Sequence, residues 1–139
     1  LSVAGHHNRL NAAAATTAAL LAGAGLGDVR GGLRGFAGLP HRLQLVAEHG
    51  GRRFYNDSLA TTPESVEVAL AAFDSPVVLL AGGYDKRVPL QGLADTIVEG
   101  TRAVALMGQT AGEVDRLLEG VVRICRCIFG MVSRCTKRF

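Results

Sequence analysis

Tryptophan is absent from this 139-residue chain, and aromatic residues make up only 5% of it. The formal net charge is +3, but five of the fifteen basic residues lie after Glu119, where no acidic residue follows. The part of the chain before them holds ten basic and twelve acidic residues and is therefore mildly acidic. Because nucleic-acid surfaces combine a basic stripe with stacking aromatics, this composition argues against a nucleic-acid partner.

Long apolar runs are also missing. No segment reaches the roughly 18 to 20 apolar residues that a membrane helix needs, because glycine, threonine and charged residues interrupt every candidate. No basic leader precedes an apolar segment, so no export signal is predicted. A hydrophobic content of 48% with 19% charged residues indicates a folded chain. We therefore expect a cytoplasmic protein without a membrane partner and, since Leu1 is not Met, a chain that begins inside a longer gene product.

Cysteine is missing from the first 124 residues, and all three cysteines, Cys125, Cys127 and Cys135, lie near the end of the chain. A C-x-C pair with one distant cysteine lacks the C-x-x-C spacing and the fourth ligand of a structural zinc site. An odd count without an export signal also argues against a disulfide framework. We therefore predict no metal site here, and the surrounding segment fits either an amphipathic helix or a strand.

The chain also lacks a phosphate-binding loop of the form G-x-x-x-x-G-K-S/T. The glycine-rich stretch 23–27 superficially resembles a dinucleotide-binding loop. However, such a loop must follow a strand and open a helix, whereas this stretch follows an Ala-rich helix. We therefore interpret it as a helix terminator.

The hydrophobic pattern predicts an α/β protein. A helix over 8–22, for which Asn8 can act as the cap, and a weaker helix over 28–35 precede a linker over 36–40. Alternating residues predict strands over 42–48 and 53–56 with a turn between them. Helices and strands then alternate, which indicates βαβ units with right-handed crossovers. These later elements are the helix 63–72, the strand 77–81, the helix 90–99, the strand 103–107 and the helix 111–118.

The stretch from Phe54 to Glu64, FYNDSLATTPE, gathers an acid, hydroxyls and a helix start in one short turn. The free backbone N–H groups and positive dipole of a helix start can bind a phosphate or a ribose. The same residues also suit an ordinary turn with an N-cap, so the motif alone leaves both interpretations open.

A second polar loop, GGYDK, follows the apolar run from Pro76 to Ala81, which is typical of a strand buried on both faces. Its glycines would let the backbone approach a ligand closely. Ligands of open α/β sheets bind at the carboxyl ends of the strands. If the two strands are parallel neighbours, Lys86 and Asp57 lie on the same rim and form a site.

Together, NDSLATTPE and AGGYDK resemble the C-terminal domain of the Mur ligases, as do GHHN with Asn11 and FAGLPHR earlier in the chain. The resemblance covers roughly residues 4 to 118, and the first motif favours the branch of the family that adds D-glutamate. It implies a Rossmann-like, mostly parallel sheet with flanking helices, preceded by the last helix or helices of the central ATPase domain. Residues 1–35 would end that ATP-binding domain, 36–122 would form an incomplete C-terminal domain, and 123–139 would be an atypical basic tail.

By this resemblance, four residues contact the nucleotide and two bind D-glutamate, and none in this chain is catalytic. Each residue also has a structural interpretation as a helix cap, solvated strand start, N-cap, turn hydroxyl or surface lysine. The nucleotide set is Asn8, Asn11, Arg42 and Asp57, and the D-glutamate set is Lys86 and Thr61. Many relatives have Lys where this chain has Leu59, so another group would have to supply the positive charge that stabilises a phosphoryl group.

The resemblance further implies ATP-dependent amide formation through an acyl phosphate, with ATP and Mg²⁺ as cofactors and the magnesium ligands upstream of this chain. The substrates would be small molecules, the protein a monomer and the isolated chain inactive. Two alternatives remain: a non-catalytic α/β binding module with a basic tail, and another amino-acid-adding ligase of the same superfamily. Because the family would continue differently after Arg123, a frameshifted C-terminus is the simplest account, and we expect it not to complete the sheet.

Overall fold

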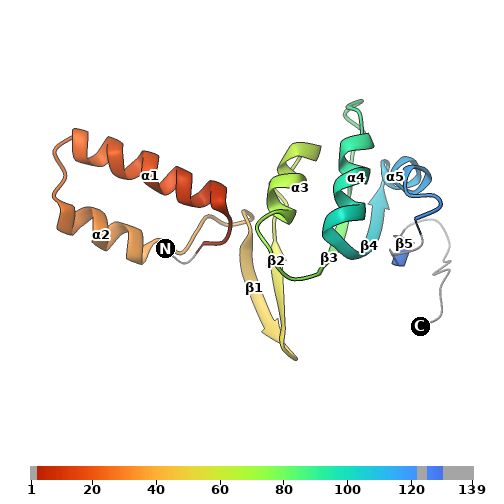
Figure 1. Cartoon of the computed structure of the whole chain (residues 1–139), viewed down its shortest axis with the longest axis horizontal. Helices are drawn as coiled ribbons and strands as arrows, with labels where there is room; N and C mark the ends of the chain where they lie inside the picture. The colour runs from red at the N-terminus through yellow and green to blue at the C-terminus, as the bar shows by residue number, and fades with distance from the viewer. Residues whose placement is uncertain (1–2, 122–124, 130–139) are drawn as a thin grey trace. The chain divides into compact units, whose positions relative to one another are not determined.

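The computed structural model describes residues 3–121 and 125–129 and divides the chain into two compact units, Leu1–Thr61 and Thr62–Phe139. Figure 1 shows the first unit as a pair of helices followed by a two-stranded hairpin, and the second as a small α/β body. In the part of the chain that is described, no helix is both long and apolar enough to cross a membrane.

The first unit begins with two helices, α1 (His6–Leu21) and α2 (Leu26–Gly35), which contact each other. Ala and Leu, which favour helix, dominate α1. The helix ends where Gly23 takes a φ of 92° and its N–H donates to the Leu20 carbonyl, so the glycine-rich stretch is confirmed as a helix terminator. The prediction that Asn8 caps α1 is wrong, because the helix begins two residues earlier with Gly5 at its N-cap.

The strands β1 (Gln44–His49) and β2 (Arg52–Asn56) form an antiparallel hairpin. Gly50 and Gly51 connect them with φ values of 57° and 71°. Positive φ at both central residues is the requirement of a tight hairpin turn, which glycine meets without steric cost. Both strands were predicted, with bounds that differ by one or two residues.

The second unit is built from alternating elements: α3 (Pro63–Leu70), β3 (Val77–Gly83), α4 (Gln91–Gly100), β4 (Thr101–Gly108), α5 (Ala111–Leu117) and β5 (Cys125–Phe129). Its sheet has the order β3-β4-β5, and both strand pairs are parallel. This confirms the predicted α/β class with a parallel sheet and flanking helices.

The core of this unit lies on one face of the sheet. Val104 and Leu106 of β4 are buried there with Ile97 of α4 and Val114 of α5. Leu79 and Ala81 of β3 pair with Val104 and Leu106 in the strand register and pack against the same cluster. The residues that alternate with Leu79 and Ala81 along β3 point to the opposite face, because successive side chains of a strand point to opposite sides. Val78 and Leu80 on that face are 62% and 67% exposed.

One expectation about the sheet is wrong, and one condition for the predicted site is not met. Residues 125–129 were expected not to join it, yet β5 runs parallel to β4 from Cys125, opposite Ala103, to Phe129, opposite Met107. The remaining tail residues, 122–124 and 130–139, lie outside the described residues. The shared rim for Asp57 and Lys86 was conditional on the strands before them being parallel neighbours, and this condition is not met, because β2 pairs antiparallel with β1 in a sheet separate from that of β3.

Candidate functional site

The segment that enters β1 and the loop that leaves β2 lie side by side at one end of the hairpin. The strand register places Gln44, the first residue of β1, opposite Asn56, the last residue of β2. Two hydrogen bonds then join the flanking segments: the Leu43 N–H donates to Asp57 Oδ1 at 2.9 Å, and the Leu59 N–H donates to the His41 carbonyl at 3.2 Å. We call the joined segments 39–44 and 56–60 the hairpin clasp.

The clasp holds an unusual backbone around Arg42. His41 and Leu43, on either side of it, have φ values of 61° and 40°. Side chains other than glycine rarely adopt this left-handed conformation, and each instance costs of the order of 1–3 kcal/mol. The hydrogen bonds that stabilise it are made by these same two residues. The Arg42 side chain is exposed, and it makes no hydrogen bond or ion pair within residues 3–121 and 125–129.

Asn56 provides a second link within the clasp. Its Oδ1 accepts the Ser58 N–H at 3.0 Å, and its Nδ2 lies 2.9 Å from Nδ1 of His41. On the other side, the His41 N–H donates to Gln44 Oε1 at 3.0 Å. The backbone N–H, the carbonyl and the ring of His41 are therefore all engaged.

Asp57, predicted from the sequence to contact a nucleotide, lies in this clasp and is half-buried. One carboxylate oxygen is committed to the backbone N–H of Leu43. The alternative that Asp57 is the N-cap of the next helix is wrong, since Thr62 holds that position. The structure thus places Asp57 and Arg42 together in the first unit, and Asp57 also has a structural task there.

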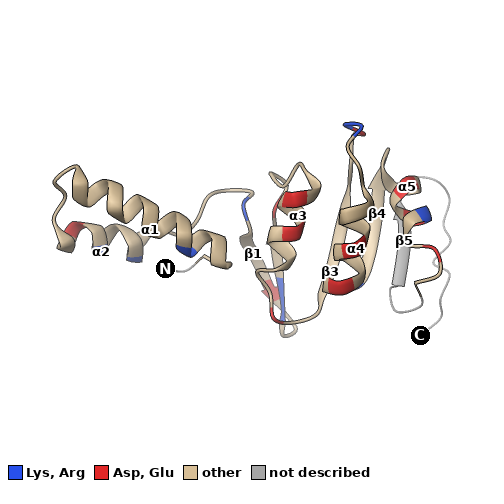
Figure 2. Ribbon diagram, turned by 45° about the horizontal axis from the view of Figure 1, so that its top comes forward, with Lys and Arg blue, Asp and Glu red and all other residues tan. Residues whose placement is uncertain are grey.

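The second polar loop follows β3 and carries Lys86, which is exposed. Figure 2 shows basic residues in blue on the loop at the top of β3. The loop is tied to the end of β4, because the Gln109 N–H donates to the Gly83 carbonyl at 2.9 Å and the Asp85 N–H donates to Gln109 Oε1 at 3.2 Å. Arg87, next to Lys86, has a φ of 58°, and its N–H donates to Asp85 Oδ1 at 2.6 Å. The loop therefore presents Lys86 at the carboxyl end of a parallel strand, where ligands of such sheets bind.

Gly82 was expected to let the backbone approach a ligand, but its close neighbour is the chain itself. Its φ is 148°, and a Cβ built there would overlap the Met107 carbonyl oxygen and lie 2.6 Å from its carbon. Gly108 has the reciprocal role, with a φ of 74° and the Gly83 oxygen 2.8 Å from its ideal Cβ. These glycines allow the ends of β3 and β4 to approach closely beneath the loop.

The other predicted residues occupy simpler positions. Asn8 is half-buried in α1 and donates from Nδ2 to the Ala4 carbonyl at 2.6 Å, whereas Asn11 is exposed one turn later on the same side of the helix. Thr61 is exposed at the end of the first unit. The structure bonds Asp57 to the backbone of Leu43, the residue after Arg42, while Lys86 belongs to the second unit.

The helix start in the first motif is capped as its sequence suggests. The Thr62 side chain accepts the Ser65 N–H at 3.4 Å, and Pro63 occupies the first helical turn. The pKa of Glu64 is lowered, chiefly by a backbone hydrogen bond to its carboxylate and secondly by a hydrogen bond from the Thr62 side chain. This carboxylate is fully exposed, so it contributes to the helix start rather than to a buried site.

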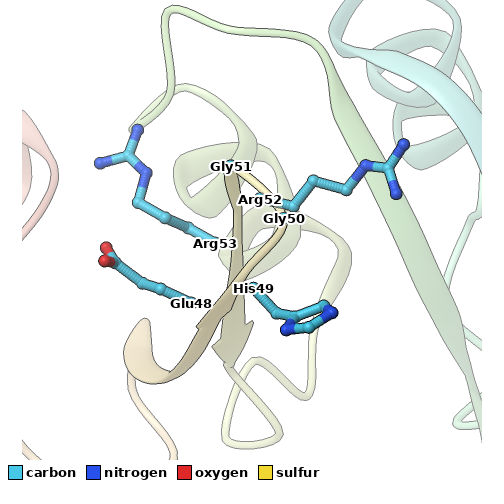
Figure 3. A pocket seen from close by; sticks show the side chains of 6 residues that line it. All are labelled: Glu48, His49, Gly50, Gly51, Arg52 and Arg53. Atoms are coloured by element: carbon cyan, nitrogen blue, oxygen red, sulfur yellow. The ribbon is translucent and has the colours of Figure 1, made fainter.

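A shallow hollow of about 340 Å³ lies at the tip of the hairpin and is lined by residues 48–53. Figure 3 shows that its side chains do not converge: Glu48 and Arg53 extend to one side of the hairpin, and His49 and Arg52 extend to the other. The register explains this, because each pair lies directly across the strands and successive pairs alternate in face. The hollow is therefore no binding site for one ligand.

Sequence reasoning missed three residues of these networks. Asn56 and His41 adjoin predicted site residues, and only the tertiary structure shows that their side chains meet. Gln109 lies 24 residues after Asp85, a separation at which no local pattern indicates contact. Among the described residues, no three His, Cys, Asp or Glu side chains gather in a way that could hold a metal ion.

Comparison with known proteins gives several similar sequences, all curated as UDP-N-acetylmuramoylalanine–D-glutamate ligases. The protein of Nitratidesulfovibrio vulgaris is 50% identical over 104 residues, which cover 75% of this chain and 24% of the relative. The protein of Geobacillus kaustophilus is 47% identical over 116 residues, covering 83% and 26%. The protein of Lacticaseibacillus casei is 43% identical over 111 residues, covering 80% and 24%. The chain thus spans about a quarter of the length of these relatives.

Among solved structures, the UDP-N-acetylmuramate–alanine ligase of Thermotoga maritima superposes with a TM-score of 0.74 and 19% sequence identity. The match covers 92% of this chain and 30% of that protein. At this identity the likeness supports the fold alone. No protein-family model matches the chain.

Proposed function

This chain belongs to the Mur ligase family, and we propose that it is part of a ligase that adds D-glutamate to UDP-N-acetylmuramoyl-L-alanine during peptidoglycan precursor synthesis. The observation that carries the proposal is the identity of 43–50% to ligases of that name over at least three quarters of the chain. The whole enzyme would be a cytoplasmic monomer with a role in cell-wall growth and cell division.

The proposed reaction forms an amide bond at the expense of ATP. The carboxylate of the L-alanine residue takes the γ-phosphoryl group and releases ADP, and the amine of D-glutamate attacks the resulting acyl phosphate. The tetrahedral intermediate then collapses with loss of inorganic phosphate and a proton. Catalysis of this kind depends mostly on positioning and charge neutralisation, and a Mg²⁺ ion held by residues outside this chain would supply part of that neutralisation.

Arg42 is suited to the nucleotide part of this reaction. Its guanidinium is exposed and unpaired within the described residues, and its backbone is held by the hairpin clasp. A planar guanidinium can bind phosphate oxygens through two parallel hydrogen bonds. Asp57 fixes the adjoining backbone and, with Asn8 and Asn11, completes the nucleotide contacts of this proposal. The magnesium ligands and the phosphate loop would lie in the rest of the enzyme, so this segment alone would be inactive.

Lys86 is suited to the acceptor part. The compact ammonium group stands on a loop at the carboxyl end of β3, anchored to β4 through Gln109. A charge-assisted hydrogen bond from this group to a carboxylate of D-glutamate would hold the acceptor amine near the acyl phosphate. Thr61 would add a hydroxyl to the same substrate.

The test uses the complete enzyme that carries this segment and measures phosphate release that depends on ATP, the UDP-linked precursor and D-glutamate. Lys86→Ala should raise the KM for D-glutamate by roughly ten- to a hundredfold, since a hydrogen bond to a charged group contributes about 1.5 to 3 kcal/mol. The KM for ATP should change much less. Asp57→Ala should raise the KM for ATP strongly and the KM for D-glutamate much less.

Arg102→Ala is the matched control, because Arg102 is an exposed cation at the amino end of β4, away from the loop. It should leave both KM values within about twofold of the original. Small, equal effects of Lys86→Ala and Asp57→Ala on both substrates would mean that the two loops are only structural turns. A lack of any dependence on D-glutamate would instead reject the proposed substrate.

A further inference from the structure

The hydrogen bonds around Asn56 define the direction of each donor and acceptor. The Ser58 N–H can only donate, so the atom that accepts it must be the oxygen of the Asn56 amide. The amide nitrogen therefore faces Nδ1 of His41, at 2.9 Å. Because that nitrogen is a donor, Nδ1 must accept, which requires a neutral His41 ring with its proton on Nε2.

This arrangement connects Asn56 to Arg42 through the backbone. The ring of His41 is held by Asn56, its carbonyl by the Leu59 N–H and its N–H by Gln44. His41 and the residue after Arg42 both take the left-handed conformation, so rotation of either would redirect the guanidinium. Because His41 and Leu43 both carry this backbone strain, other contacts must offset it.

We infer that Asn56 is a positioning residue for nucleotide binding, which acts through His41 to fix the backbone that aims Arg42 at a phosphate. The inference rests on the proposed function, because it takes the partner of Arg42 to be ATP. Asn56 touches none of the three substrates in this scheme. By holding the backbone of Arg42 in place, Asn56 reduces the conformational entropy that Arg42 would lose on binding ATP.

The kinetic test is a double-mutant cycle in the complete enzyme. Asn56→Ala should raise the KM for ATP about three- to tenfold, the effect of one or two neutral hydrogen bonds, and leave the KM for D-glutamate unchanged. In an Arg42→Ala background the same substitution should raise the KM for ATP less than about twofold, since the residue that it positions is gone. Gln91→Ala is the matched control, because it removes an exposed amide hydrogen bond of 2.9 Å on α4 and should change neither constant.

The outcomes separate the two proposals. If Arg42→Ala leaves the KM for ATP unchanged, the nucleotide contact of Arg42 in the proposed function is rejected. If Arg42→Ala raises it but Asn56→Ala has no effect, or an equal effect in both backgrounds, the positioning role is overturned and the nucleotide contact stands.

A second measurement does not depend on activity. In this 139-residue chain, nitrogen NMR of the histidine rings at about pH 8, where imidazoles are neutral, should find His41 with an unprotonated Nδ1 and a protonated Nε2. Asn56→Ala should reduce that preference to the level of the exposed rings of His6 and His49, which should stay as they were. A protonated Nδ1 in the unsubstituted chain would overturn the link between Asn56 and His41.

Discussion

Substitution of Gly82 tests how the loop of Lys86 is built. Gly82→Ala adds a Cβ that would overlap the Met107 carbonyl oxygen of β4, at a residue whose φ is 148°. Backbone in this region costs side chains other than glycine about 1–3 kcal/mol, and forcing an extra carbon into a packed contact costs about 1–3 kcal/mol more. The lower entropy of the unfolded alanine chain offsets about 0.4–1 kcal/mol.

The net loss should therefore be about 1–6 kcal/mol, a substantial part of the roughly 5–15 kcal/mol that stabilises a typical domain. Urea unfolding of the 139-residue chain should show a lower midpoint. Amide hydrogen exchange should be faster within β3 and β4, where the strands must separate, and unchanged in the β1–β2 hairpin of the first unit.

Gly83→Ala is the control for this experiment. A Cβ at Gly83 meets no atom within 4 Å, and its φ lies outside the left-handed range, so the substitution should change the free energy of unfolding by no more than about 1 kcal/mol. Equal midpoints for Gly82→Ala and Gly83→Ala would refute the close approach of β3 and β4 as the reason for glycine at this position.

Two further predictions concern stability and solubility. Thr62→Ala removes the N-cap of α3 and should lower the free energy of unfolding by about 0.5–1 kcal/mol in urea titrations, with Ser58→Ala as an exposed serine control. Because the pKa of Glu64 is lowered in the folded state, its contribution is present above its unfolded pKa and is lost as pH falls through the folded one. Thr62→Ala should move that loss to higher pH, and an unchanged Glu64 titration would contradict the assignment. Leu80 lies on the exposed face of the edge strand β3, so Leu80→Lys should reduce light scattering of the concentrated chain with little loss of stability. Leu79 faces the core, so Leu79→Lys should destabilise the chain. Equal behaviour of the two variants would reject the assignment of the faces.

The sequence by itself determined the order and type of the elements up to α5. Helices and strands follow from periodicity over a few residues, and their ends from local chemistry such as Thr62 with Pro63 or the pair Gly50-Gly51. The motif NDSLATTPE also marked Asp57, which the structure places beside Arg42. These features depend on a few neighbouring residues or follow from the resemblance of the sequence motifs to a known family.

Only the tertiary structure decided which distant residues meet. Strand pairing brought β5 into the parallel sheet, although this choice does not change the local pattern of the strand. Side chains from separate segments then took on tasks that no spacing predicts: Asp57 holds the backbone of Leu43, and Gln109 holds the loop of Lys86. The physical reason is that these contacts join residues 14 to 24 positions apart, and their geometry exists only after the strands have paired.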